Sequence, residues 1–163
     1  MNVKKAVYLF LALLLPVFVF LFLRTFGKNE FAVKPLYSEN FPSVSAGCTP
    51  VRKLPYILPD SIIKGYSKGS DSLSVVFFGA IKDEAANQFR RVQEELRNDG
   101  VAVFSVEDTV TNATIMRCFF FLKNPFDVVL FDTRGGIRGN YTSGNRDEID
   151  RLLTEVTIIQ KRY

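Results

Sequence analysis

The stretch that decides the fold is SVVFFGAIKDE, residues 74–84. Its first half belongs to the apolar, β-branched run 73–78, which is typical of a strand buried on both faces of a sheet. Its second half predicts a helix start, with Asp83 as a good N-cap and Glu84 near the positive helix end. Ligands and reactive groups gather at such carboxyl ends of strands in open α/β sheets. None of the turn residues here is a redox thiol or a soft metal ligand; they are Gly79, Ala80, Ile81, Lys82 and Asp83.

A helix and a second strand follow this junction. Apolar side chains at positions 85, 89, 92 and 96 recur at helical spacing, so they form one face that packs on the sheet. Gly100 supplies the left-handed conformation that ends a helix. Residues 101–106 form a second apolar, β-branched run. Strand, helix and strand at these lengths predict a βαβ unit with two parallel strands.

The C-terminal part predicts a hairpin and a last helix. Two apolar runs, 118–122 and 128–132, are separated by a break that contains proline. The turn TRGG then leads into a returning strand at 137–141. A βαβ unit, a β-hairpin and a terminal helix make the thioredoxin-like arrangement, so we expect an α/β domain of that class over residues 73–163. The last helix has one apolar face: Ile149, Leu152, Leu153, Val156 and Ile159.

A different pattern marks the N-terminal part of the chain. Residues 6–23 carry no charge and would extend about 27 Å as a helix, close to the thickness of a bilayer core. A cleaved signal peptide is the alternative, but its apolar core is shorter and ends at a small-x-small site, which residues 21–26 lack. We predict a retained single-pass transmembrane helix within an anchor of residues 1–28. Basic residues flank both ends, so their charges favour a cytoplasmic amino terminus only weakly.

Residues 29–72 connect the anchor to the folded part. Five of the seven prolines of the chain lie here. Proline at this density interrupts helices and is kept out of central strands. We therefore expect a tether followed by an extended lead-in that wraps the domain.

The excess of positive charge lies beside the predicted membrane segment. All 17 acidic residues lie from Glu30 onward, whereas Lys4, Lys5, Arg24 and Lys28 precede it. The remaining charges balance, so the net charge of +4 belongs to the anchor, where cations meet anionic lipid head groups. The sequence has no basic stripe interleaved with aromatic residues, so we expect no nucleic-acid partner.

Several segments together carry a resemblance to a known family. Besides the apolar N-terminal helix, they are LPD at 58–60, VVFF at 75–78 and RVQEEL at 91–96. The strongest match is VVLFDTRGGIRGNY at 128–141. On these segments the chain resembles the SCO/SenC family, membrane-anchored, thioredoxin-like copper proteins that assist cytochrome oxidase assembly. The resemblance implies a soluble domain on the periplasmic side of a membrane.

The departures from that family decide the expected chemistry. Members place a Cys-x-x-x-Cys pair just after the double phenylalanine and complete a copper site with a distant histidine. Thiolates and imidazole together suit both copper oxidation states. This sequence has no cysteine in residues 79–86 and no histidine at all. We therefore expect the copper site to be lost and predict no metal and no other cofactor; a site built from Cys48, Met116 and Cys118 is the weaker alternative.

Cys48 and Cys118 are the two cysteines of the chain, and three interpretations are open. The favoured one is a structural disulfide that pins the lead-in to the sheet, as an oxidising compartment would allow. A redox-active pair and two free thiols are the others, and a thiol is reactive only where its pKa is lowered. Arg117 is adjacent to Cys118, but the apolar run that follows indicates burial.

Pro125 is the remaining candidate at the expected site. It precedes the strand at 128–132, where thioredoxin-like folds often hold a cis-proline beside the active site. An ordinary trans proline in a turn is the alternative.

Two functional hypotheses follow. The first is a non-catalytic binding or assembly factor for respiratory or envelope proteins. The lack of thiols and soft metal ligands in the turn 79–83 favours it. Such a factor would be held by a single-pass membrane anchor and would contact a protein partner on the periplasmic side. The second is an enzyme that reduces thiol-disulfide or peroxide substrates with Cys48 and Cys118.

Overall fold

The computed structural model describes residues 3–26, 33–40, 42–48, 53–69, 72–107 and 109–161. The chain divides into two units, Met1–Phe31 and Ala32–Tyr163. The first unit holds helix α1 (Val3–Phe26), which contains Pro16. Within the described part of the chain, no helix is both long and apolar enough to cross a membrane. The transmembrane span expected at 6–23 is not confirmed and stays a prediction.

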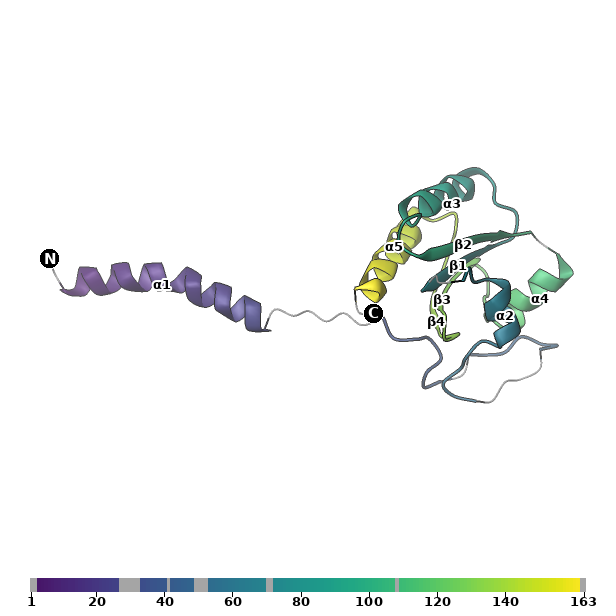
Figure 1. The fold of residues 1–163 in the computed structure, drawn as a ribbon, viewed down its shortest axis with the longest axis horizontal. Coiled ribbons are helices and arrows are strands. Elements are labelled where there is room, and N and C mark those ends of the chain that lie inside the picture. Colours follow the sequence, from purple (N-terminus) through teal and green to yellow (C-terminus); the bar gives the residue numbers. More distant parts are fainter. Residues whose placement is uncertain are drawn as a thin grey trace. The chain divides into compact units, whose positions relative to one another are not determined.

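The second unit is built on a four-stranded mixed sheet in the order β2-β1-β3-β4 (Figure 1). Strands β1 (Leu73–Phe78) and β2 (Val101–Val106) are parallel and are joined by helix α3 (Asp83–Glu95). Strand β3 (Val128–Asp132) is antiparallel to β1 and forms a hairpin with β4 (Ile137–Tyr141). Helix α5 (Arg146–Gln160) follows the hairpin. The predicted βαβ unit, hairpin and terminal helix are therefore present, in a thioredoxin-like arrangement.

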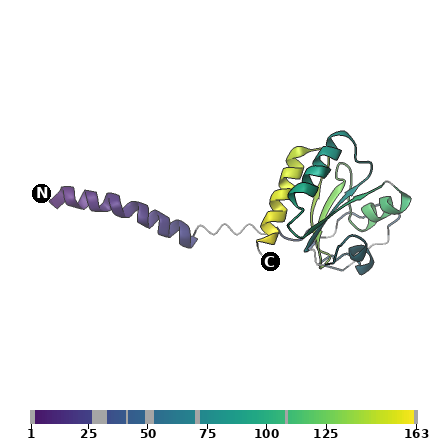
Figure 2. The same cartoon turned by 45° about the horizontal axis from the view of Figure 1, so that its top comes forward.

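Helices cover both faces of this sheet, as Figures 1 and 2 show. Because strand residues alternate between faces, Val75 packs with side chains of α3 and α5, whereas Val76 belongs to a second hydrophobic cluster on the opposite face. That face carries α2 (Asp60–Gly65) and α4 (Val110–Cys118), which contribute Ile62 and the half-buried Met116 to the second cluster.

The sequence pattern missed α2 and α4. α2 is a short helix that starts directly after Pro59, inside the segment expected to be irregular. α4 buries no residue completely, so it shows no apolar periodicity, and its β-branched residues have low helix propensity. Its start is stabilised by Thr109, whose side chain accepts a hydrogen bond from the Asn112 N–H at 3.2 Å.

The lead-in lies along the β3–β4 hairpin and reaches the second hydrophobic cluster, the one that contains Val76. The Leu36 N–H donates to the Ile137 carbonyl at 2.6 Å, which supplies a partner on the outer edge of β4. Farther along, the Leu58 N–H donates to the Gly135 carbonyl at 2.9 Å. The lead-in is thus part of the folded unit, and it covers one of the two edges of the sheet.

Candidate functional site

The end of β1 is bonded to both neighbouring strands. The Phe78 N–H donates to the Asp127 carbonyl at 2.8 Å, and the Gly79 N–H donates to the Val106 carbonyl at 2.9 Å. Gly79 has a φ of +95°, a conformation that glycine adopts without steric cost. The chain then turns away from the sheet toward α3.

The expected N-cap role of Asp83 is wrong. Lys82 occupies the cap position and makes no side-chain cap bond, and Asp83 is already the first helical residue. Its φ of +49° lies in the left-handed region, which short polar side chains such as aspartate tolerate better than most. The helix was expected one residue later because a carboxylate is a favourable group anywhere in the first turn.

An open cleft of about 300 Å³ lies beside this junction. Of the turn residues 79–83, only Gly79 lines it, and Ile81 instead packs against the hydrophobic core. The cleft has an apolar part and a polar part. The apolar side chains are Phe78, Ala113, Met116 and Phe126, and the polar ones are Glu107, Asn112, Asn124 and Asp127.

The fold brings these segments together through the sheet. β3 is antiparallel to β1, so the loop that precedes β3 lies at the same end of the sheet as the residues that follow β1. β2 is parallel to β1 and ends there as well, which brings in Glu107 and then α4. Four separate segments therefore form one cleft.

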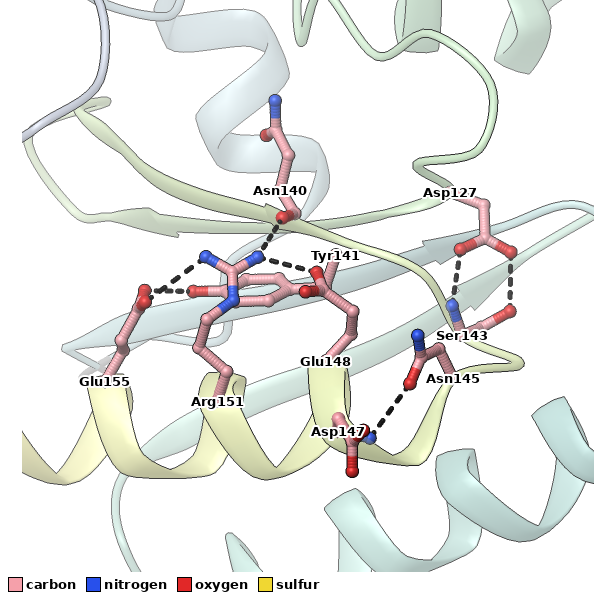
Figure 3. A network of polar contacts seen from close by, with 9 residues as sticks. All are labelled: Asp127, Asn140, Tyr141, Ser143, Asn145, Asp147, Glu148, Arg151 and Glu155. Atoms are coloured by element: carbon pink, nitrogen blue, oxygen red, sulfur yellow. Dashed lines mark hydrogen bonds and ion pairs between the residues drawn. The ribbon is translucent and has the colours of Figure 1, made fainter.

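The charged groups of the cleft are acidic. Asp127 accepts two hydrogen bonds from Ser143, from the N–H to Oδ1 at 2.7 Å and from Oγ to Oδ2 at 2.5 Å (Figure 3). Glu107 has an exposed side chain, and its carbonyl accepts a bond from Asn112 Nδ2 at 2.8 Å. No lysine or arginine belongs to the described lining, so Glu107 and Asp127 carry its charge.

Pro125 lies in the lining of the cleft. The Asn124–Pro125 peptide bond is cis, the first of the two states considered for this position. The Leu54–Pro55 bond of the lead-in is also cis.

Cys48 and Cys118 form a disulfide with a Cα–Cα distance of 5.3 Å, so the predicted bond is confirmed. It joins the lead-in to the end of α4, and the expectation that it joins the lead-in to the sheet is wrong. The error has a simple cause, because the apolar run after Cys118 is buried while Cys118 itself ends a helix and is half-buried. Neither cysteine lines the cleft. Lys123 Nζ donates a further hydrogen bond to Ser43 Oγ in the same part of the lead-in.

The alternative copper set does not fit this geometry. Met116 lines the cleft, whereas the sulfurs of Cys48 and Cys118 are bonded to each other and offer no thiolate. Among the described residues, no group of three or more histidine, cysteine, aspartate or glutamate side chains could hold a metal ion.

A second polar network joins β4 and α5 (Figure 3), and none of its residues lines the cleft. Tyr141 donates to Glu155 Oε2 at 2.6 Å, and the Arg151 guanidinium lies 4.6 Å from the centre of its ring. Burial, and then the Glu155 carboxylate, raise the pKa of Tyr141. Nearby, Asn145 caps α5 by accepting a bond from the Asp147 N–H at 3.0 Å. Tyr141 is fully buried, so its hydroxyl is structural.

Sequence reasoning did not find the polar residues of the cleft. One signal was present, because Asp127 directly precedes a strand that the hairpin makes antiparallel to β1. Glu107 directly follows β2 and could have been placed by the same reasoning. Asn112 lies on α4, which the sequence did not predict, and Asn124 is next to Pro125, which was expected at the site but drew no attention to its neighbour.

Comparison with known proteins adds little to this picture. No family model matches the sequence, and no curated protein matches it. One solved structure with some similarity is human ERp44 in its zinc-bound form, at 15% identity and a TM-score of 0.38. The aligned part covers 62% of this chain and 28% of that chain. The resemblance to the SCO/SenC family is thus not confirmed, and the fold class rests on the strand order and connections described above.

Proposed function

We propose that this chain is a non-catalytic binding protein with a thioredoxin-like fold, and that the cleft beside Gly79 holds an extended segment of a protein partner. The observation that carries the proposal is the chemistry of the cleft. The junction after β1, where such folds hold reactive groups, lines an open cleft that contains no thiol. The two cysteines of the chain are used up in a bond outside it.

The cleft selects a particular kind of segment. Phe126 is 38% exposed and Met116 is half-buried, so apolar surface is open to a ligand side chain. The carboxylates of Glu107 and Asp127 favour a positive charge beside it. We therefore propose an occupant that carries an apolar residue next to a lysine or arginine.

The tether and the compartment are further parts of the proposal. Large apolar side chains of α1 are strongly exposed, among them Leu13 at 67% and Phe18 at 66%. Exposed apolar surface of this kind marks a contact with a membrane or another protein, and we propose that α1 is a single-pass anchor in a membrane. A disulfide persists in oxidising compartments, which supports a periplasmic domain. The resemblance to the SCO/SenC family suggests a partner in the assembly of respiratory or envelope complexes.

A peptide-binding measurement tests the cleft. The full chain in detergent is titrated into a fluorescein-labelled nonapeptide with a central Leu-Lys, and into a matched peptide with Leu-Glu. We expect saturable binding of the first and much weaker binding of the second. Phe126→Ser removes binding, whereas Ile57→Ser, an exposed apolar residue outside the cleft at 55% exposure, leaves it unchanged.

A charge variant separates the two parts of the cleft. Glu107→Gln weakens binding of the Leu-Lys peptide by up to about fivefold, the range of an exposed ion pair. Glu94→Gln on α3 leaves the binding of this peptide unchanged. Equal binding of both peptides, or loss of binding in the Ile57 variant as well, would contradict the proposed occupant.

The alternative, an enzyme that uses Cys48 and Cys118, is tested by the reduction potential of their bond. Both residues are half-buried, so the bond is not sealed from reductants. We expect a low potential, as in structural disulfides, and no reduction of insulin or peroxide. A high potential with turnover that Cys48→Ser abolishes would replace the binding protein by the enzyme.

A further inference from the structure

The outer edge of β2 carries backbone groups that have no partner among the residues the structure describes. β2 is an end strand of the sheet, and its register with β1 is regular from Val101 to Val106. The Val106 carbonyl accepts a hydrogen bond from the N–H of Gly79, the residue that follows β1. The backbone groups of the even-numbered residues of β2 therefore point toward β1. Successive residues alternate in direction. The N–H and C=O groups of Val101, Val103 and Ser105 therefore point away from the sheet, and in the described part of the chain they make no hydrogen bond.

Both ends of this open edge are closed by side chains. Asn112 Nδ2 donates to the Glu107 carbonyl at 2.8 Å, beyond the last strand residue. Gln160 Nε2 donates to the Asp99 carbonyl, before the first one. Since residues 99 and 107 have the same parity as the open ones, the residues whose N–H and C=O are both open lie between these two closed carbonyls.

β2 also lacks the features that usually protect a sheet edge. Its sequence, VAVFSV, contains no charge, no proline and no glycine, and its pairing with β1 has no bulge. The opposite edge differs, because the lead-in supplies the bond from Leu36 to Ile137 of β4. An edge of this kind is a template for another strand.

We propose that β2 pairs with β2 of a second copy of this chain, antiparallel, about a twofold axis at Val103. In this register Val103 lies opposite Val103 of the second copy, and Val101 lies opposite Ser105. Each pair exchanges two backbone hydrogen bonds, so all six unpaired groups find partners at once. The proposal goes beyond the function assigned to the cleft and does not depend on it.

Two features favour a second copy over a foreign strand as the occupant. The three open residues are symmetric about their middle one, so the strand is complementary to itself in hydrogen bonding. The side chains on the other face match in size, because Phe104 comes opposite the small Ala102 of the second copy. Phe104 is only half-buried within one copy, so it has surface left to cover.

The register also has a cost outside the bonded segment. Glu107 comes opposite Asp99 of the second copy, and both side chains are exposed carboxylates. Salt screens this repulsion. We therefore expect the association to strengthen as the ionic strength rises.

Cysteine cross-linking of the full chain in detergent tests the register. Cys48 and Cys118 are bonded to each other, so an added cysteine is the free one. Residues opposite each other in a hydrogen-bonded pair have Cα atoms about 5.5 Å apart, within the range of a disulfide. Val103→Cys should give a covalent dimer on mild oxidation. Val101→Cys is the matched control, since its two copies would lie about 13 Å apart along the strands.

Sedimentation of the uncross-linked chain completes the test. We expect a concentration-dependent dimer that Ser105→Lys abolishes, because the exposed Ser105 can carry a charge without disturbing the core. Gln93→Lys, an exposed site on α3, should leave the dimer intact. A monomer at hundreds of micromolar, or equal cross-linking of the Val101 and Val103 variants, would overturn the proposal. A dimer that Ser105→Lys does not affect, or one that salt weakens, would overturn it as well.

Discussion

Asp132 and Arg138 form an ion pair at 2.7 Å across the β3–β4 hairpin, and both side chains are buried. The same carboxylate accepts bonds from the N–H groups of Arg134 at 2.9 Å and Gly136 at 3.0 Å. Arg138 also donates to the Val33 carbonyl at 2.9 Å. One ion pair therefore holds the hairpin turn and the start of the lead-in together.

Loss of this buried carboxylate should be strongly destabilising. Asp132→Ala leaves the Arg138 charge buried without its main partner, and we expect the free energy of unfolding to fall by about 3–5 kcal/mol. Urea denaturation followed by circular dichroism measures it. The matched control is Asp150→Ala, which breaks the more exposed Arg91–Asp150 pair and should cost about 1 kcal/mol or less. Equal costs for the two variants would show that the Asp132 pair contributes no more than a surface contact.

Removal of the disulfide should lower stability without removing the fold. Cys48 and Cys118 close a loop with a sequence separation of 70. In the chain-entropy model the double variant Cys48→Ser/Cys118→Ser loses about 4 kcal/mol of unfolding free energy. Denaturation of the wild-type chain with and without dithiothreitol should show the same difference, and the double variant should not respond to the reductant. A loss that is near zero would mean that the lead-in is held by its other contacts.

Gly139 is required by the ring of Tyr141. A Cβ on Gly139 would overlap the Tyr141 side chain, with the ring carbon Cε2 at 2.9 Å and the hydroxyl nearer still. Tyr141 is fully buried and bonded to Glu155, so it has no room to move away. We expect Gly139→Ala to cost about 1–3 kcal/mol, the range for overpacked cores. Gly144→Ala is the control, since a Cβ there meets no atom within 4 Å; thermal unfolding of both variants would reveal an equal response if the clash were relieved at no cost.

Stability should fall at high pH because of Tyr56. Burial raises the pKa of Tyr56 to about 12 from its ordinary value of 10.0, and its hydroxyl donates to the Phe119 carbonyl at 2.9 Å. The folded state therefore holds this proton more tightly than the unfolded state. Its contribution to stability is complete below pH 10 and is lost as the pH rises toward 12.

The variant Tyr56→Phe isolates this group. It should be less stable than the wild type at neutral pH, and the difference should shrink between pH 10 and 12. Tyr141 also has a raised pKa, so part of the alkaline loss will remain in the variant. A constant difference over this pH range, measured by urea denaturation, would show that Tyr56 ionises in the folded state as it does in water.

The sheet could be predicted from the sequence because its two central strands, β1 and β3, are buried on both faces. The runs at β1 and β3 are apolar except for Ser74 and Asp132, and the structure buries every residue of both. The disulfide could be predicted because the chain has two cysteines, which can pair with each other in one way only. α4 could not be predicted, because a helix that buries no residue completely leaves no periodic trace in its sequence.

The cleft could not be predicted from the sequence for a related reason. Glu107, Asn112, Asn124 and Asp127 come from segments that meet only through the strand order of the sheet. The junction after β1 lies at the carboxyl end of a strand, as the sequence predicts. The neighbouring segments form a cleft beside this junction because of where α4 lies. The sequence contains no signal for the position of α4.

The bond between Cys48 and Cys118 also decides how mechanical force would pass through the folded unit. A pull on the N-terminal part of the chain enters at the lead-in and reaches Cys48. From there the sulfur bridge carries the tension directly to Cys118, at the end of α4. Residues 49–117, which include β1, α3 and β2, lie on a closed loop that this tension bypasses. The strands β1 and β2 are therefore shielded from being unravelled from the N-terminal side, as long as the bridge stays oxidised.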